Sequence, residues 1–438
     1  MNLKKNKCWI LYCIFITFLI VIILYGSLLR HHYLGGQQFN NISKIATFFA
    51  DIPSNVKKIL LPDYDITSKK HKDKKKLSSK INKNEDRLLL LSRYSPIKKN
   101  FVVEIIDLKT FEVLHQYKNT KKKEIIKFIN NKEEYKNFIS RPKNKQIMKN
   151  PLMLRDGSII YQQEYGPLVR KNFCGKIMWV NSEDLFHHYI TKYDDKHIFV
   201  PSSKYPFSNK VSNYRKNFGF KDDSITKLNI DGTIIYQKSL IEILKENNFL
   251  SDSIFKNEDP IHLNKIEPVL KDTKYFKKGD LFLSSPTISA IIHYRPKSNK
   301  IINYLVGEFS WQHDVDVISE NEISIFNNNE YGIDSKYSEI LIYNFETKKY
   351  KKILEKKLKK ENFKTRLQGV HQTLNDGSLL LEETMHGRLL LFDKYGNLKL
   401  EYINKHNNKS YMLAWSTIIE DKDLIEKILN LIKIKKCI

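Results

Sequence analysis

The chain has 438 residues, a formal net charge of +26 and 41% hydrophobic residues. Its length exceeds that of a usual single domain, which predicts either two domains or one large closed all-β domain. A charge of this size suits a nucleic-acid partner only when basic residues gather on one face with aromatic residues, or belong to a known binding module. The sequence contains no such module, so we expect no nucleic-acid partner and leave contact with an anionic lipid or substrate open.

An uncharged apolar run of 22 residues, CWILYCIFITFLIVIILYGSLL, occupies residues 8–29. A helix of this length crosses ~30 Å of hydrocarbon, whereas the apolar core of a cleaved signal peptide is usually shorter. Three lysines precede the run and one arginine follows it closely, so the positive-inside rule keeps the N-terminal tip in the cytoplasm. We therefore predict a single-pass transmembrane signal anchor over residues 1–30, with the C-terminal domain periplasmic or otherwise extracytoplasmic.

The segment after the apolar run is basic and polar. Its densest part, SKKHKDKKKLSSKINKNEDR at residues 68–87, has few apolar residues, which predicts a solvated linker. We accordingly expect a basic linker over residues 31–87 and a β domain over residues 88–438. Cys174 and Cys437 lie in the exported part and could pair in an oxidising compartment, although their spacing alone does not decide it.

A hairpin pattern recurs after residue 88: an apolar strand, a polar turn often containing Gly or Asn, and a second strand. The copies lie about 50 to 65 residues apart, which is the period of a propeller blade of about four strands. The period predicts an all-β, six-bladed β-propeller rather than a barrel or sandwich, and residues 239–250 predict a helix at the rim of one blade. The six hairpins span residues 102–117, 169–180, 225–240, 291–305, 340–354 and 389–403.

Histidines open a second recurring motif that falls between the hairpins. Each is followed by a strand, a polar turn and another strand, and the four are His188, His262, His313 and His371. If that strand is the innermost of its blade, equivalent residues from successive blades gather at one end of the central channel. We therefore expect these four side chains to face a common axis.

Several neutral imidazoles around one funnel suit nucleophilic or proton-transfer chemistry and the binding of an anion. A metal site is the rival interpretation, since imidazoles also bind Zn, Cu or Ni. No convergent carboxylate or thiolate set accompanies them, and Asp314 can instead orient the neighbouring ring. We expect no metal and no cofactor.

Four stretches together resemble the bacterial arylsulfotransferase family of six-bladed propellers: residues 222–244, DPIHLNKIEP at 259–268, GEFSWQHDVDVISENEISIFNNN at 307–329, and residues 369–393. The resemblance covers most of residues 155–404. It implies transfer of a sulfuryl group from an aryl sulfate ester to a phenolic acceptor.

The resemblance also implies roles for individual residues. His313 matches the family histidine that carries the sulfuryl group covalently, and His188 matches the histidine of an HH pair with His187 beside it. His262 and Asn264 match an HxN motif that binds the sulfate. Such a nucleophile splits one transfer into two steps, while polar neighbours stabilise charge on the moving oxygens.

Two positions depart from the family pattern. Pro286 and Thr287 stand where the family places an arginine, and Tyr189 replaces an acidic residue. Arg388, in a later blade, is predicted to compensate as a substrate-binding residue. Asn264, Asp314 and His187 are predicted to bind the substrate as well, and His371 completes the catalytic set. The alternatives are a non-catalytic, membrane-tethered propeller that binds a glycan or a partner protein, and a quinone-dependent dehydrogenase suggested by GKIMW at residues 175–179.

Overall fold

The computed structural model describes residues 2–33, 42, 45–46, 48–49, 66–82, 86–130, 133–142, 146–204, 207–208, 211, 220–249, 258–330, 336–434 and 437. The chain divides into two compact units. The first contains residues 1–65 and 251–258, and the second contains residues 66–250 and 259–438.

The first unit contains one long helix, α1 (Asn2–Tyr33). Its segment Trp9–Leu29 has a mean hydropathy of 2.6, and none of its most apolar window is buried against protein. At 1.5 Å per residue, these 21 residues reach about 30 Å, the thickness of the hydrocarbon core. An exposed apolar helix of this length and position has the properties of a membrane anchor or a signal sequence.

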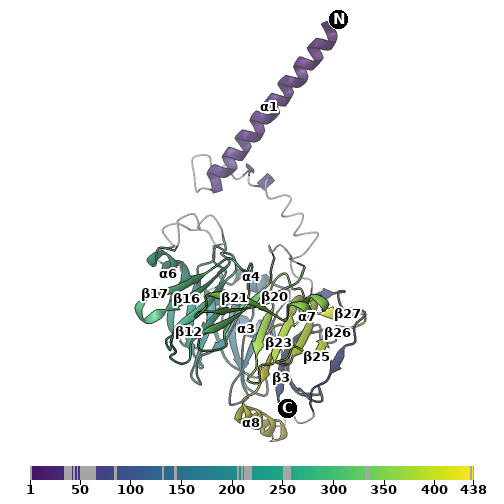
Figure 1. Ribbon diagram of the computed structural model, residues 1–438, viewed down its shortest axis with the longest axis vertical. Helices are drawn as coiled ribbons and strands as arrows, with labels where there is room; N and C mark the ends of the chain where they lie inside the picture. The colour runs from purple at the N-terminus through teal and green to yellow at the C-terminus, as the bar shows by residue number, and fades with distance from the viewer. Residues whose placement is uncertain are drawn as a thin grey trace. The chain divides into compact units, whose positions relative to one another are not determined.

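The second unit consists mostly of antiparallel sheets (Figure 1). Three sheets have consecutive strands in simple up-and-down order, and an eight-stranded sheet joins two further sets, β6–β9 and β10–β13, through β9 and β11. The strands of these sets are β6 (Lys149–Met153), β7 (Ile159–Gln162), β8 (Gly166–Lys171), β9 (Ile177–Phe186), β10 (Thr191–Lys192), β11 (His197–Ser203), β12 (Asp223–Asn229), β13 (Ile234–Ser239), β14 (Lys265–Pro268), β15 (Leu281–Ser285), β16 (Ala290–Arg295), β17 (Lys300–Leu305), β18 (Asp314–Val317), β19 (Glu322–Asn327), β20 (Glu339–Asn344), β21 (Lys349–Ile353), β22 (Val370–Thr373), β23 (Leu379–Glu383), β24 (Arg388–Phe392) and β25 (Leu398–Ile403). Successive four-stranded antiparallel sheets are the building units of β-propellers.

One further sheet combines distant parts of the chain. Strand β28 (Thr417–Ile419) pairs with β3 (Leu88–Ser95), which continues into β4 (Asn100–Asp107) and β5 (Val113–Lys118). Residues 90 and 417 are therefore neighbours in one ladder.

All six predicted hairpins are confirmed. They are the pairs β4–β5, β8–β9, β12–β13, β16–β17, β20–β21 and β24–β25. Burial explains their recognisable pattern, because a strand such as β16 is buried almost throughout while its partner β17 is largely exposed or half-buried. The predicted helix is also present as α6 (Leu240–Glu246), which Ser239 caps by accepting from the Glu242 N–H at 3.3 Å.

The short remaining elements lie in the connections and at the sheet edges. They are α3 (Lys122–Ile126), α4 (Lys136–Ser140), α7 (Glu355–Lys360), η3 (Pro296–Ser298), η4 (Thr384–His386), β26 (Lys405–His406) and β27 (Lys409–Tyr411).

Part of the predicted linker is folded against the sheets. Strand β1 (Thr67–Ser68) pairs with β27, and β2 (Leu77–Ser79) adds a fifth strand beside β25. Between them His71 is 4% exposed, and its Nε2 lies 2.7 Å from Glu383 Oε2, while Lys70 pairs with the other oxygen of Glu383. The segment therefore differs from a solvated linker because its basic side chains contact a buried carboxylate that lies 312 residues from His71 in the sequence.

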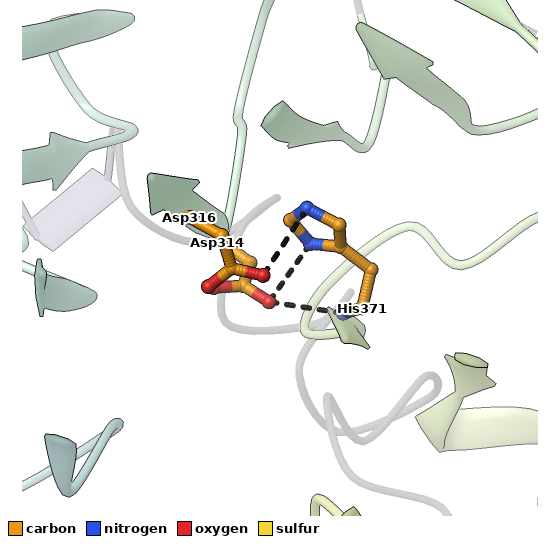
Figure 2. A group of neighbouring side chains, drawn as sticks. All are labelled: Asp314, Asp316 and His371. Carbon is orange, nitrogen blue, oxygen red and sulfur yellow. Dashed lines mark hydrogen bonds and ion pairs between the residues drawn. The ribbon is translucent and has the colours of Figure 1, made fainter. Parts of the chain in front are cut away.

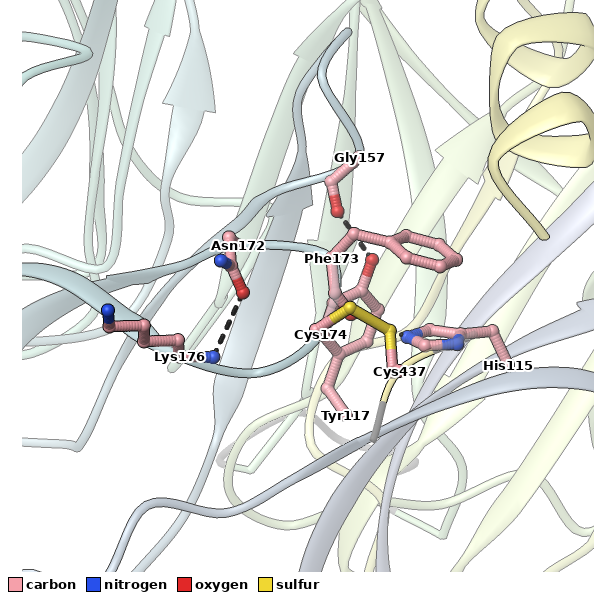
Figure 3. The surroundings of a disulfide bond; sticks show 8 residues. All are labelled: His115, Tyr117, Gly157, Asn172, Phe173, Cys174, Lys176 and Cys437. Carbon is pink, nitrogen blue, oxygen red and sulfur yellow. Dashed lines mark hydrogen bonds between the residues drawn. A yellow bond between two sulfur atoms is a disulfide. The ribbon is translucent and has the colours of Figure 1, made fainter. Parts of the chain in front are cut away.

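A disulfide joins Cys174 to Cys437 (Figure 3). Cys174 lies in the turn between β8 and β9, and Cys437 follows helix α8 (Lys422–Ile434), whose buried residues include Ile425 and Ile428. The bond links positions 263 residues apart and attaches the end of α8 to a sheet.

Candidate active site

A residue with left-handed backbone precedes the first strand of five strand sets. The φ angles are 59° at His188, 53° at His262, 55° at Trp311, 65° at Gln368 and 69° at Trp415, two or three residues before β10, β14, β18, β22 and β28. This conformation costs a non-glycine residue about 1 to 3 kcal/mol and is concentrated at functional sites. The entry to each first strand is therefore a repeated, strained turn.

These turns show that the four predicted histidines do not occupy equivalent positions. His188 and His262 are the left-handed residues themselves, whereas His313 follows its left-handed residue, Trp311, by two positions. His371 follows Gln368 by three positions and already belongs to β22. The prediction of four equivalent histidines is corrected to two equivalent residues and two displaced ones.

Three of the four nevertheless meet. The His188 ring centroid lies 4.8 Å from that of His262 and 6.2 Å from that of His313, and His187 packs edge-on against His188 at 5.0 Å. His187, His188 and His313 are buried, whereas the His262 side chain is 23% exposed. We call His187, His188, His262 and His313 the histidine cluster.

Asn328 fixes the tautomer of His313. Its side-chain N–H groups donate to the backbone carbonyls of Thr365 at 2.9 Å and Gln368 at 2.6 Å, so its Oδ1 faces His313 Nδ1 at 2.8 Å. Nδ1 must therefore carry the proton, and the backbone N–H of Gln368 donates to the lone pair of Nε2 at 3.0 Å. His313 is held as a neutral imidazole whose Nε2 faces the segment around Gln368.

Electrostatics keep the central histidines neutral. Burial lowers the pKa of His313 to about 4, and the charges of His262 and Lys149 act in the same direction, while its bonds to Asn328 and the Trp311 carbonyl oppose the shift. Burial, followed by the Lys149 charge, holds the pKa of His188 well below its usual range. At neutral pH both rings are therefore neutral, and each has one ring nitrogen without a proton.

Carboxylates lie behind the other two imidazoles. His262 Nδ1 is 2.6 Å from Asp259 Oδ2, and His187 Nε2 is 3.3 Å from Asp223 Oδ1. Burial alone would raise the pKa of Asp259, but the bond to His262 and the Lys221 ammonium hold it well below its usual range. The carboxylates orient both rings.

Asn264, predicted as a sulfate-binding residue, is fully buried beside the cluster. Its side-chain N–H donates to the Gln312 carbonyl at 3.4 Å, while its Oδ1 has no hydrogen-bond partner among the residues that the structure describes. Its backbone N–H donates to Ser284, and its carbonyl accepts from Tyr189. Main-chain hydrogen bonds therefore fix Asn264 between the turn before β10 and the end of β15.

Asp314 and His371 form a second, adjacent network (Figure 2). Asp314 Oδ2 accepts from both the backbone N–H and the ring Nδ1 of His371, each at 2.9 Å. The other oxygen of Asp314 lies 2.8 Å from Lys265 Nζ, and His371 Nε2 lies 2.7 Å from Ser324 Oγ. Burial opposes a charged His371, but Asp314 and Asp316 raise its pKa above the usual value. Asp314 thus orients His371 and the segment after Gln368, whereas Asn328 orients His313.

Among the described residues, Asp314, Asp316 and His371 also form a group that could hold a metal ion, with ligand atoms within 4.8 Å of one another. Lys265 pairs with both aspartates and is buried, so its ammonium already occupies the cationic position. A divalent ion would have to displace this lysine.

Arg388 lies in a different ion-pair group. Its guanidinium is fully buried, with Nη2 2.5 Å from Glu361 Oε2 and Nε 2.7 Å from Glu401 Oε1. A third carboxylate, Glu383, lies 3.8 Å from Nη1. None of the contacts described for Arg388 brings it to the histidine cluster.

The structure adds residues that the sequence analysis did not select: Asn328, Lys149 and Trp415. Lys149 is fully buried at the start of β6, and Trp415 lies 5.7 Å from His188 between ring centroids. One signal was available for Trp415, because AWST at residues 414–417 precedes a strand as SWQH does at 310–313. A lone lysine in a chain so rich in lysine gives no comparable signal.

Antiparallel four-stranded sheets and a buried cluster of imidazoles define a β-propeller-like protein with a histidine site. The family model of the arylsulfotransferases (ASST) matches residues 150–405, more than half of the chain. The chain therefore belongs to the arylsulfotransferase (ASST) family, and the resemblance found from its motifs is confirmed. No protein of curated function matches it.

Solved structures of low sequence identity also match parts of the chain. A protein of unknown function from Bacteroides caccae is 12% identical, with 77% of this chain and 100% of that chain covered and a TM-score of 0.49. The Cps50 (Swd1) β-propeller domain of Myceliophteria thermophila is 7% identical, with 77% and 99% covered and a TM-score of 0.41. Virginiamycin B lyase from Staphylococcus aureus is 12% identical, with 60% and 72% covered and a TM-score of 0.35.

Proposed function

We propose that this chain is an arylsulfotransferase that moves a sulfuryl group from an aryl sulfate ester to a phenol through a sulfo-histidine at His313. The observation that carries the proposal is the fixed tautomer of His313. Asn328 accepts from Nδ1, so the lone pair resides on Nε2, and burial keeps the ring unprotonated at neutral pH by lowering its pKa to about 4. A neutral, oriented imidazole is a competent nucleophile.

The reaction then has two balanced steps. In the first, the Nε2 lone pair forms an N–S bond while the bond from sulfur to the aryl oxygen breaks, and the phenoxide leaves with the electron pair and takes up a proton. In the second, the oxygen of the acceptor phenol attacks the sulfur, the N–S bond breaks, and the phenolic proton departs. His313 is restored with its lone pair on Nε2.

The rest of the histidine cluster surrounds the group being transferred. His188 and His262 lie within 4.8 Å of one another by ring centroids, and His188 lies 6.2 Å from His313. Hydrogen-bond donors positioned where charge develops on the transferring oxygens typically lower the barrier by a few kcal/mol each. Asn264 Nδ2 is one such donor, because its hydrogen bond to the Gln312 carbonyl is long, at 3.4 Å.

The Gln368 peptide must move before attack, since its N–H occupies the Nε2 lone pair at 3.0 Å. Gln368 and Gly369 both have positive φ, at 65° and 103°, and a Cβ at Gly369 would lie 2.7 Å from the Phe326 ring. Once displaced from nitrogen, this N–H is expected to donate to a sulfuryl oxygen.

The proposed enzyme is a six-bladed propeller anchored in a membrane. The strand sets, with β28 beside β3–β5, support a count of six blades, and the exposed apolar helix α1 supports an anchor. The disulfide between Cys174 and Cys437 supports an oxidising, extracytoplasmic location for the catalytic domain.

The direct test is mass spectrometry of the full chain in detergent after brief exposure to p-nitrophenyl sulfate. We expect a mass increase of one SO3 group on the peptide containing His313, and its discharge when a phenol is added. His313→Ala should show neither the adduct nor transfer. An adduct on another residue, or unchanged transfer in His313→Ala, would exclude this mechanism.

One contact favours a second function, a tethered propeller that binds a glycan or partner protein without catalysis. If the Gln368 N–H never leaves His313 Nε2, the nucleophile stays blocked. Saturable ligand binding with no adduct, under conditions in which the protein is folded, would identify this second function.

A further inference from the structure

Lys149 is an ammonium group buried within the proposed site. It is fully inaccessible to solvent, and its described salt-bridge partner is Glu164, which precedes β8. A lysine ammonium has three N–H donors. Because one carboxylate cannot use all three donors in a buried site, Lys149 retains the capacity to bind a further acceptor.

The indole of Trp415 lies directly beside this ammonium. Lys149 Nζ is 4.1 Å from the Trp415 ring centroid, and the same ring is 5.7 Å from His188. Trp415 is fully buried, yet its Nε1–H has no hydrogen-bond partner among the described residues. A buried indole N–H usually has an acceptor, so this donor indicates a place for one.

The main chain holds Trp415 in place. Its φ of 69° puts it at the same turn position as His188 and His262, which both belong to the histidine cluster. Glu382 fixes the turn by accepting from the backbone N–H groups of Trp415 at 2.9 Å and Ser416 at 2.7 Å. Trp415 is therefore the contribution of the β28 turn to the same site.

We infer that Lys149 and the indole N–H of Trp415 form an anion-binding subsite beside His188 that holds the sulfonate oxygens of the aryl sulfate. The inference rests on the proposed function and extends it by naming the cationic donor. The described hydrogen-bond acceptor of Lys149 Nζ is one oxygen of Glu164, and none is described for the Trp415 indole N–H. A sulfonate brings three acceptor oxygens with a delocalised negative charge. Lys149 also acts electrostatically on both His188 and His313, since its charge helps to lower the pKa of each ring.

The test measures binding separately from transfer. In the full chain carrying His313→Ala, which lacks the nucleophile, p-nitrophenyl sulfate binding is followed by calorimetry. We expect Lys149→Met to weaken binding by about tenfold or more and Lys149→Arg to retain most of it, as loss of a charge-assisted hydrogen bond predicts. Trp415→Phe, which keeps a ring but lacks the N–H, should weaken binding by about threefold to tenfold.

Two control variants test whether a general loss of structure, and not the loss of the subsite, explains weaker binding. Lys171→Met removes another buried lysine, whose Nζ donates to the Lys118 carbonyl at 2.6 Å, and should leave binding within about twofold. The double variant Lys149→Met and Glu164→Gln removes both charges together, so the protein folds without a buried unpaired carboxylate. It should bind p-nitrophenyl sulfate more weakly than the His313→Ala parent, as Lys149→Met does.

The outcomes separate this inference from the proposed function. Absence of binding to the His313→Ala parent, or binding within twofold of that parent in the Lys149→Met and Glu164→Gln protein, overturns the inference. Loss of binding in that protein, together with absence of any adduct on His313 in the unmodified chain, supports the anion subsite while rejecting the transferase.

Discussion

Acidification should slow the first step at this site far less than it would slow the same step at an ordinary histidine nucleophile. The perturbation is a change from pH 8 to pH 5, and the reactive form is the neutral His313 ring. With a pKa of about 4, about nine tenths of His313 stays neutral at pH 5, whereas a ring with the usual pKa of about 6.5 would keep only about 3%. The structure thus predicts a rate of the first step at pH 5 about thirty times that expected from an exposed histidine.

The assay is the single-turnover release of p-nitrophenol from p-nitrophenyl sulfate, quenched into alkali, over pH 3.5 to 8. The sulfate ester does not titrate in this range, so the acid limb of kcat/KM reports an enzyme group. Near-UV circular dichroism at each pH gives the folded fraction, and His313→Ala gives the background. An acid limb centred between pH 6 and 7 in fully folded protein would refute burial as the determinant of His313 reactivity.

Three further predictions concern stability and the role of individual residues. Arg388→Met should lower the free energy of unfolding by about 1.5 to 3 kcal/mol because it removes the charge-assisted hydrogen bonds of a fully buried guanidinium to Glu361 and Glu401, although both carboxylates keep Lys74 as a partner. KM for aryl sulfate in the folded protein should stay unchanged, and a raised KM would instead make Arg388 a substrate ligand. Cys437→Ser should lower the unfolding free energy by about 2 to 5 kcal/mol, measured by denaturant titration, and added reductant should no longer affect it. The stability of the intact chain should fall as the pH drops from about 6.5 to 4. His313 and His386 each have a folded pKa of about 4, so the unfolded chain binds those protons at a higher pH than the folded chain does. A free energy of unfolding that is constant over this range would contradict both shifts.

Local patterns in the sequence predicted the hairpins because each depends on residues that are close in the chain. Apolar alternation and a Gly or Asn turn determine β24–β25 within sixteen residues, without reference to the rest of the fold. Residues 66–80 lack such a pattern. These residues are positioned by contacts with β25, β27 and the buried Glu383, all of which are far away in the sequence. The lysine-rich sequence alone therefore predicted a solvated linker.

The site was predictable only in part for a related reason. His188, His262 and His313 could be selected as histidines before strands, but the left-handed residue that sets the register of each turn has no fixed identity. Without that register, the sequence does not show that His371 lies inside its strand whereas the other histidines precede theirs. The difference matters because a shift of one position along a strand turns a side chain to the opposite face. The buried partners Asn328 and Lys149 depend on tertiary contacts alone.

The pairing of β28 with β3 has a consequence for how the protein is made. Residues 88–95 are synthesised early, yet their edge partner at 417–419 follows more than three hundred residues later, and Cys437 comes later still. During the export that we propose for this domain, the edge of β3 would therefore stay without its native neighbour until nearly the whole domain has crossed. Such long-range closure is slow and leaves an unpaired strand edge exposed in the meantime. On that proposed route, a chaperone or a disulfide-forming enzyme that acts late in translocation would influence the yield of folded protein more than any factor that meets the first strands.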